Sequence, residues 1–211
     1  MKPFAEIHKR TAEIYQKHAK AWDLHRPKVF FEKAWLDKFI DPLPTSAKVL
    51  DLGCGAGEPI ASYLIEHGFN VTGVDISSAM LEICRSRFPD ASWIEQDMRE
   101  LNMPTNFDGI VSWDAFFHLN QTEQRNTLKL LSDHLNDNGA LLLTIGHEAG
   151  EVLGTVEGES VYHSSLAPQE YKDILYSFGF SQVEIELEDE SCGFHTVLLA
   201  QKGNSAIQNI T

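Results

Sequence analysis

Residues 48–57 read KVLDLGCGAG, an apolar segment that runs directly into a glycine-rich turn. The pattern predicts a buried strand over residues 48–52 and a helix from about residue 59 to residue 67, with Gly68 as its stop signal. Backbone N–H groups that are free at the start of such a helix can receive a polar or anionic ligand group. The turn between the strand and the helix is therefore the first candidate binding site.

Strands and helices continue to alternate along the chain after this turn. Further strands are predicted at residues 70–75, 91–96, 108–113 and 140–145, the last of them after a turn at residues 137–139. One helix is predicted from Ser77 or Ser78 to Phe88, and another begins at Asn120, whose side chain can form a capping box with Glu123. Strands that alternate with such helices form crossover units, so the sequence predicts a doubly wound α/β fold with a mostly parallel sheet.

The two ends of the chain differ from this alternating middle. Residues 1–47 are predicted to form an N-terminal helical lid or extension, residues 48–202 a single domain, and residues 203–211 a flexible tail. Segments 183–188 and 195–201 are separated by a short loop, and we expect them to pair as a terminal antiparallel hairpin at the sheet edge.

The chain has 211 residues, of which 43% are apolar, and a formal net charge of −14. Its length suits one domain, since a single core serves roughly 100 to 250 residues. The acidic charge argues against a nucleic-acid partner, because such a surface repels phosphates. We expect a monomer or a homodimer that binds a small-molecule substrate.

Cysteine content and hydropathy indicate the compartment. Cys54, Cys84 and Cys192 are too few and too scattered for a disulfide framework or a zinc site. The first residues, MKPFAEIHKR, lack the apolar core of a signal peptide, and no run of about 18 apolar residues is present for a membrane span. We expect a cytoplasmic protein without a membrane partner or a bound metal.

Acidic residues lie at the ends of successive predicted strands, beside the glycine-rich turn. Asp75 closes its strand and can accept both hydroxyls of a ribose. Asp97 and Met98 suit an adenine, because the carboxylate can bind the exocyclic amine while the thioether packs on the ring. The turn has the spacing G-x-G-x-G, with Glu58 where a dinucleotide fingerprint needs its third glycine. This pattern indicates a nucleoside ligand that lacks phosphates and carries positive charge.

Five segments in this order resemble the motifs of the class I S-adenosylmethionine-dependent methyltransferases, over roughly residues 48–200. They are VLDLGCGAG at 49–57, GVDIS at 73–77, QDM at 96–98, DGIVSWDAFFHL at 108–119 and LNDNGALLLTI at 135–145. The resemblance implies S-adenosylmethionine as the cofactor and S-adenosylhomocysteine as its product. It also implies a Rossmann-like seven-stranded sheet whose final strand is antiparallel.

The same resemblance implies a set of cofactor contacts, in which the glycines of the turn line the methionine moiety and the acidic strand-end residues bind the ribose and the adenine. The expected set is Tyr15, Trp22, Asp51, Gly53, Cys54, Gly55, Gly57, Asp75, Ile76, Met80, Gln96, Asp97, Met98, Ser112 and Trp113. Asp51 has a second open role, in which it holds the glycine turn by accepting backbone N–H bonds. Cys54 and Met80 can equally serve as packing.

Methyl transfer is an in-line displacement at a carbon that the sulfonium already activates, so the protein chiefly aligns the reactants and excludes water. The catalytic candidates are Asp114 and His118, four residues apart, which share a face if a helical turn begins there. His118 is the preferred base or substrate anchor, and local packing of His118 is the alternative. This segment differs from the N-P-P-Y type of amino-directed nucleic-acid methyltransferases, which argues against a nucleic-acid base as the acceptor.

Aromatic residues near the N-terminus and a Gly- and Glu-rich insert at residues 146–166 can surround the acceptor. Tyr15, His18 and Trp22 follow helical spacing on one face, and Tyr15 and Trp22 either line the pocket or pack in the core. The composition of the insert favours mobile backbone over a helix, and its two histidines can flank the acceptor.

The sequence therefore predicts an S-adenosylmethionine-dependent methyltransferase that acts on a small molecule. Two alternatives stay open. A nicotinamide-dependent oxidoreductase on a similar sheet would bind NAD, and the missing third glycine of the fingerprint counts against it. A non-catalytic protein that binds S-adenosylmethionine or scaffolds a partner would keep the same motifs, and nothing in the sequence excludes it.

Overall fold

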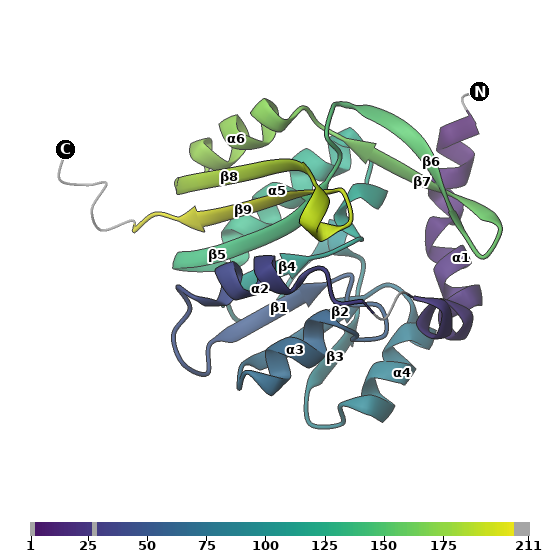
Figure 1. Cartoon of the computed structure of the whole chain (residues 1–211), viewed down its shortest axis with the longest axis horizontal. Helices are drawn as coiled ribbons and strands as arrows, with labels where there is room; N and C mark the ends of the chain where they lie inside the picture. Colours follow the sequence, from purple (N-terminus) through teal and green to yellow (C-terminus); the bar gives the residue numbers. More distant parts are fainter. Residues whose placement is uncertain (1–2, 27–28, 205–211) are drawn as a thin grey trace.

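The computed structural model describes residues 3–26 and 29–204. Seven strands form one sheet in the order β3–β2–β1–β4–β5–β9–β8 (Figure 1). Their bounds are β1 Lys48–Leu52, β2 Asn70–Asp75, β3 Ser92–Glu95, β4 Phe107–Ser112, β5 Leu135–Ile145, β8 Phe180–Asp189 and β9 His195–Lys202. The first five strands pair in parallel, whereas β9 is antiparallel to both β5 and β8. The predicted α/β fold, with its mostly parallel seven-stranded sheet and terminal antiparallel hairpin, is confirmed.

β1 is an interior strand of the sheet, and its sequence is consistent with this position. All of its residues after Lys48 are buried, as expected for a strand that is covered on both faces. It pairs with β2 on one side and with β4 on the other, so the strand order reverses between β1 and β4. Ligands of open α/β sheets bind at such a switch point, outside the carboxyl ends of the strands.

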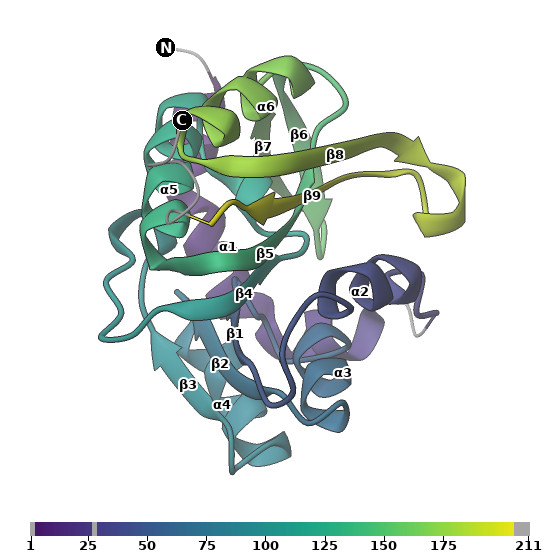
Figure 2. The same ribbon diagram turned by 90° about the vertical axis from the view of Figure 1, so that its left-hand side faces the viewer.

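Helices cover both faces of the sheet (Figure 2). They are α1 Pro3–His25, α2 Lys33–Ile40, α3 Ile60–Glu66, α4 Ser78–Arg87, α5 Gln121–His134 and α6 Pro168–Ser177, with 3-10 turns η1 Met98–Glu100, η2 Phe116–His118 and η3 Glu190–Cys192. The predicted caps of two helices are present. Ser77 accepts from the backbone N–H of Met80 at the start of α4, and Asn120 and Glu123 form the capping box of α5.

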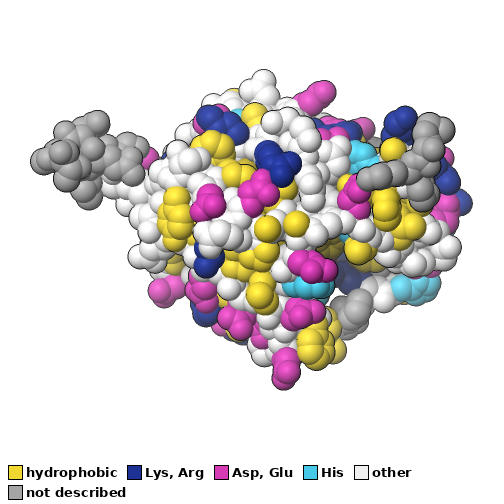
Figure 3. Space-filling model, turned by 90° about the horizontal axis from the view of Figure 1, so that it is seen from above, with side chains coloured by type: hydrophobic (Ala, Val, Ile, Leu, Met, Phe, Trp, Pro, Cys, Tyr) yellow, Lys and Arg dark blue, Asp and Glu magenta, His cyan; other side chains and the backbone are white. Residues whose placement is uncertain are grey.

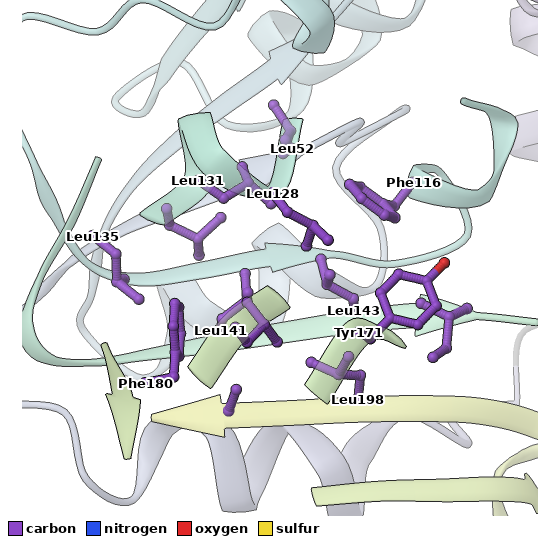
Figure 4. Close-up of a cluster of buried hydrophobic side chains, with 14 of the residues drawn as sticks. Leu52, Phe116, Leu128, Leu131, Leu135, Leu141, Leu143, Tyr171, Phe180 and Leu198 are labelled. Carbon is purple, nitrogen blue, oxygen red and sulfur yellow. The ribbon is translucent and has the colours of Figure 1, made fainter. Parts of the chain in front are cut away.

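Side chains of β5 pack against helices on both faces of the sheet. Leu141 and Leu143 join a buried cluster with Leu128 of α5 (Figure 4), whereas Leu142 belongs to the opposite cluster with Phe39 of α2. Successive side chains of a strand point to opposite faces, so the continuous apolar run of β5 supplies both cores.

The boundary between α5 and β5 differs from the prediction. No separate turn precedes the strand, because β5 begins at Leu135 directly after the helix. Leu135 pairs with Phe107 and Ala140 pairs with Gly109, so β5 has extra residues between these two pairs. Such a bulge accommodates turn-forming residues within a strand, and Asn138 in it has a φ of +62°.

The insert at residues 146–166 is not the mobile loop that its composition indicated. It forms an antiparallel hairpin of β6 Gly150–Val156 and β7 Glu159–Ser165, which lies beside α1 in Figure 1. Val156 and Val161 of the hairpin bury themselves against Ile14 of α1. The contacts that stabilise the hairpin are therefore tertiary, and they cannot be predicted from the composition of residues 146–166 alone.

The predicted division into a helical extension, a central domain and a tail falls partly outside the described residues. Of the predicted tail, residues 205–211 lie outside them, as do residues 27 and 28 after α1. No helix of the described chain is both long and apolar enough to cross a membrane. Acidic and basic side chains are interspersed over the face shown in Figure 3.

Candidate active site

A pocket lies at the switch point, among residues that follow β1, β2, β3 and β4, and α1 forms one of its walls. Most of the predicted cofactor contacts line it: Tyr15, Trp22, Asp51, Gly53, Cys54, Gly55, Asp75, Ile76, Met80, Gln96, Asp97, Met98 and Trp113. The predicted catalytic residues Asp114 and His118 line it as well. The parallel sheet thus brings together residues that are far apart in the sequence.

The glycine-rich turn approaches the pocket with its backbone. Gly53 donates its N–H to the carbonyl oxygen of Val74 at 2.7 Å, and Gly55 donates to Oδ2 of Asp75 at 2.9 Å. A Cβ on Gly53 would lie 2.3 Å from Cβ of Ala115, whereas a Cβ on Gly55 would meet no other part of the protein within 4 Å. Because Gly55 lines the pocket, this open space lets a ligand come close to the backbone.

Gly57 and Ser112 are not among the residues that line the pocket. A Cβ on Gly57 would lie 3.2 Å from the ring of Phe88 and 3.3 Å from Sγ of Cys84. The fully buried hydroxyl of Ser112 donates to the carbonyl oxygen of Leu52 at 2.7 Å and so links β4 to β1. The structure thus places these two expected contact residues behind the pocket wall, and motif spacing does not show which way each residue faces.

Asp75 at the end of β2 holds the turn in place. Its Oδ2 accepts from Gly55, and its Oδ1 accepts from the backbone N–H of Ser77 at 2.8 Å. Burial raises the pKa of Asp75, and the backbone hydrogen bonds partly offset this effect. Each carboxylate oxygen can accept more than one hydrogen bond, so both can still receive ligand hydroxyls.

Two buried polar atoms of the pocket wall have no hydrogen-bond partner within the described part of the chain. They are Oδ2 of Asp51 and Nε1 of Trp113, in side chains that are 2% and 5% exposed. Burial raises the pKa of Asp51 to about 7. The N–H groups of Gly53 and Gly55 bond elsewhere, which favours ligand contact over loop support as the role of Asp51. Buried polar groups are ordinarily paired, so both atoms point to a polar ligand.

Asp97 and Met98 lie on the side of the pocket that follows β3. Asp97 caps η1 by accepting from the backbone N–H of Arg99, and it also accepts from Nε of Arg99 at 2.9 Å. Burial opposes the charge of Asp97, but the hydrogen bonds from Arg99 outweigh it and lower the pKa. The Arg99 guanidinium also contacts Glu123 at 3.1 Å, which anchors this wall to α5.

The other wall comes from α1. Tyr15 and Trp22 both line the pocket, with their ring centroids 5.5 Å apart in an edge contact. The Tyr15 hydroxyl donates to Nε2 of His118 at 2.9 Å, and Nδ1 of His118 donates to the carbonyl oxygen of Tyr162 at 2.9 Å. His18, predicted on the same helical face, instead contacts Glu159 of the hairpin at 2.7 Å.

His118 is neutral in this environment. Burial lowers its pKa to about 4. One ring nitrogen donates to a backbone carbonyl and the other accepts from Tyr15, so both nitrogens are occupied. This pattern assigns His118 to the support of α1 more readily than to proton transfer.

Asp114 and His118 do not share a helical face as expected. Asp114 has a φ of +54° and precedes η2, so no continuous helical turn joins the two residues. Its Oδ1 contacts Nε2 of His195 at 2.9 Å, and sequence reasoning missed this partner. His195 begins β9, and an antiparallel strand starts at the edge where parallel strands end. The predicted start of the final strand at residue 195 was therefore the sequence feature that could have placed His195 near the pocket.

The histidines of the insert, His147 and His163, have different surroundings. The His163 ring contacts the rings of Phe117 and His118, with centroids 4.6 Å and 4.9 Å away. The exposed His147 lies 3.8 Å from Glu148 and is not among the residues that line the pocket. Within residues 3–26 and 29–204, no three His, Cys, Asp or Glu side chains gather as metal ligands would.

Comparisons of sequence agree with this geometry. A family model described as a methyltransferase domain matches residues 49–139. A putative methyltransferase of Bacillus subtilis (strain 168) is 33% identical over 175 residues, which cover 77% of this chain and 65% of that protein. The match spans slightly less than two thirds of that relative's length.

Solved structures share the fold. An amino pentose methyltransferase from Micromonospora echinaspora, with S-adenosylmethionine bound, superposes with a TM-score of 0.67 at 20% identity, over 87% of this chain and 95% of that one. A 1,6-didemethyltoxoflavin-N1-methyltransferase of Burkholderia thailandensis, with its substrate and S-adenosylhomocysteine bound, gives 0.70 at 18% identity, over 95% and 88%. At these identities the likeness concerns the fold.

Proposed function

We propose that this chain is a class I S-adenosylmethionine-dependent methyltransferase, which transfers the methyl group of S-adenosylmethionine to a small-molecule acceptor. One observation carries the proposal: the pocket at the switch point combines a glycine turn open at Gly55 with an unpartnered buried carboxylate at Asp51. This combination suits a cofactor that is cationic at its amino-acid end and carries no phosphate.

The residues present fit the parts of that cofactor. Asp51 would receive the ammonium group, since its Oδ2 is buried without a partner. Asp75 would accept the ribose hydroxyls at the end of β2, and Asp97 with Met98 would hold the adenine. Gly55 would leave room for the methionine moiety.

When bound, S-adenosylmethionine supplies a methyl group that its sulfonium activates toward a nucleophile. The protein's task is then to align the acceptor and to exclude water. The segment from Trp113 to Ala115 follows β4 at the pocket, and Tyr15 and Trp22 of α1 cover it. We assign α1 of the N-terminal extension to this cover and residues 48–202 to the cofactor-binding domain, whereas α2 of the extension packs in the core.

The α1 helix is tied to the cofactor side by specific contacts. Gln16 accepts from the Ser77 hydroxyl at 2.8 Å and from the Ala79 N–H at 3.1 Å, at the start of α4. Asp23 accepts from Arg87 at 2.8 Å. A helix held this way forms a fixed wall of the pocket.

The small-molecule class rests on the pocket at the switch point and on the relatives. The Micromonospora protein is an amino pentose methyltransferase, and the Burkholderia enzyme was solved with bound 1,6-didemethyltoxoflavin. We place the reaction in the cytoplasm, in keeping with three cysteines that are all buried and free.

Parallel calorimetric titrations with S-adenosylmethionine, S-adenosylhomocysteine and NAD test the proposal. We expect micromolar binding of the two sulfur nucleosides and no binding of NAD. Binding of NAD alone would favour an oxidoreductase. Binding of the sulfur nucleosides, with no methyl transfer to any of a broad panel of radiolabel-assayed acceptors, would favour a non-catalytic binding protein.

A further inference from the structure

Three constraints hold Asp114 in the pocket wall directly after β4. Its backbone has a φ of +54°, in the left-handed region that residues other than glycine rarely adopt. Its N–H donates to Oγ1 of Thr144 at 2.8 Å, and its Oδ1 accepts from Nε2 of His195 at 2.9 Å. Backbone strain persists only where the surroundings impose it, and such positions cluster at functional sites.

The hydrogen bonds of His195 show that its ring is charged. Nδ1 lies 2.7 Å from the carbonyl oxygen of Cys192, and Nε2 faces the Asp114 carboxylate. Both partners are acceptors, so both ring nitrogens donate and the ring is an imidazolium. The hydrogen bond to Asp114 raises the pKa of His195, and the ionisable groups that act on its ring are Asp114 and Glu32.

The ion pair presents its carboxylate to the pocket. Asp114 is among the lining residues, whereas His195 is not. Oδ1 is taken by His195, and within the described residues no hydrogen bond reaches Oδ2. A ligand in the pocket therefore meets a hydrogen-bond acceptor with negative charge.

We propose that Asp114 binds the methyl acceptor through Oδ2, that the acceptor is an amine, and that His195 is the positioning residue that holds Asp114 in place. This inference rests on the proposed methyl transfer and names the acceptor that it uses.

The chemistry favours an amine over other acceptors. The acceptor binds as an ammonium group and releases one proton to solvent through Asp114, which frees the nitrogen lone pair. The lone pair forms the new N–C bond while the C–S bond breaks and its electron pair goes to sulfur, so positive charge returns to nitrogen. Asp114 stabilises this developing charge, and the ammonium product then loses a proton through Asp114 to solvent.

A hydroxyl or a carboxylate acceptor fits less well. An alcohol holds its proton far more tightly than an alkylammonium group does, so it needs a stronger base to become a good nucleophile. The nitrogens of His118 are both occupied, so His118 does not supply the missing base. A carboxylate acceptor would be repelled by Asp114.

Aromatic rings complete the site. Tyr15, Trp22 and Trp113 line the same pocket, and such rings bind both cations and apolar carbon. The acceptor class is therefore an amine attached to an apolar framework.

Three probes that share a cyclohexyl ring test this inference: cyclohexylamine, cyclohexanol and cyclohexanecarboxylate, each titrated into protein saturated with S-adenosylhomocysteine. We expect the amine to bind at least about tenfold more tightly than the other two. Asp114→Asn should weaken amine binding by about tenfold while leaving the affinity for S-adenosylhomocysteine unchanged, and Asn tolerates the left-handed backbone at this position.

Substitutions of His195 separate positioning from packing. His195→Phe keeps a ring beside Trp113 but loses both hydrogen bonds, and we expect it to weaken amine binding by roughly fivefold. His195→Gln can retain a donor toward Asp114 and should recover most of the affinity. His147→Phe removes an exposed histidine away from the pocket and serves as the control.

NMR titration of the His195 ring supplies a readout that a purely structural histidine would not give. An ammonium group at Asp114 places a like charge near the imidazolium, so the amine should lower the pKa of His195 while cyclohexanol leaves it unchanged. This measurement uses the wild-type chain and decides the matter even if Asp114→Asn fails to fold.

Several results would overturn the inference. They are equal binding of the amine and the alcohol, no amine binding up to about 100 mM, unchanged amine affinity in Asp114→Asn, or an unmoved His195 titration. Failure of S-adenosylhomocysteine to bind would instead refute the proposed function, so the two outcomes are distinguishable.

Discussion

The Tyr15 hydroxyl donates to Nε2 of His118 across 2.9 Å, and this bond ties α1 to the turn after β4. The second nitrogen of the same ring donates to Tyr162 in β7. One imidazole therefore joins the N-terminal helix, the turn after β4 and the hairpin around the pocket. The cover over the proposed cofactor site depends on this histidine.

Loss of the Tyr15 hydroxyl should loosen that cover. Tyr15→Phe leaves Nε2 of the half-buried His118 without its Tyr15 donor, and we expect a loss of about 1 kcal/mol in the free energy of unfolding. Urea denaturation measures this loss. Tyr176→Phe, at a half-exposed tyrosine of α6, is the matched control and should change little. Equal effects in the two variants would contradict the role of the bond.

The neutral state of His118 predicts a pH dependence of stability. Its folded pKa is about 4, below the value near 6.5 of an unfolded histidine, so the folded state binds fewer protons between these values. Its contribution should be present above about pH 6.5, fall as the pH is lowered, and be lost below about pH 4, a total on the order of 3 kcal/mol.

Urea denaturation at several pH values between these limits checks the His118 prediction. The difference between wild type and His118→Gln isolates the histidine from the many carboxylates that titrate nearby. A constant difference across this range would show that His118 is not buried in the neutral form.

Asp51 should couple cofactor binding to proton release. Its pKa in the free protein is about 7, and a cationic ammonium group beside it would favour the ionised form. Calorimetry near pH 6.5 in buffers of different ionisation enthalpy should show release of a fraction of a proton on binding S-adenosylmethionine. Asp51→Asn should abolish the release and weaken binding by about tenfold or more. Proton release that persists in Asp51→Asn would assign it to another group.

The open space at Gly55 should be essential for the cofactor. Gly55→Val fills that space, and we expect affinity for S-adenosylhomocysteine to fall by at least about tenfold, or 1.4 kcal/mol. Gly158→Val is the control, because Gly158 also has a positive φ with open space but lies in the turn of the hairpin. The two substitutions share backbone strain, so only filling of the pocket distinguishes them. Normal binding by folded Gly55→Val would refute the placement of the turn.

Much of the fold could be predicted because its signals are local. The capping box of Asn120 and Glu123 acts within one turn of helix, and the buried runs of β1 and β5 mark central strands. The hairpin at residues 150–165 could not be predicted, since its Val156 and Val161 gain their burial only from Ile14 of α1.

The candidate site divides in the same way. Residues at the ends of parallel strands meet at one edge by topology, so Asp75 and Asp97 reach the same pocket as their positions predict. Gly57 and Ser112 belong to the same motifs but face the interior, and only the structure shows their orientation.

The sequence by itself determined the succession of strands and helices along the chain, the glycine turn and the acidic residues at the strand ends. Periodicity, caps and turns act over a few residues, so they are visible in the sequence. Only the tertiary structure decided that Asp114 pairs with His195 rather than sharing a helical face with His118. These partners are 81 residues apart. Their contact depends on an antiparallel final strand that starts at the edge where the parallel strands end. No pattern over a few residues predicts a contact between residues so far apart in the sequence.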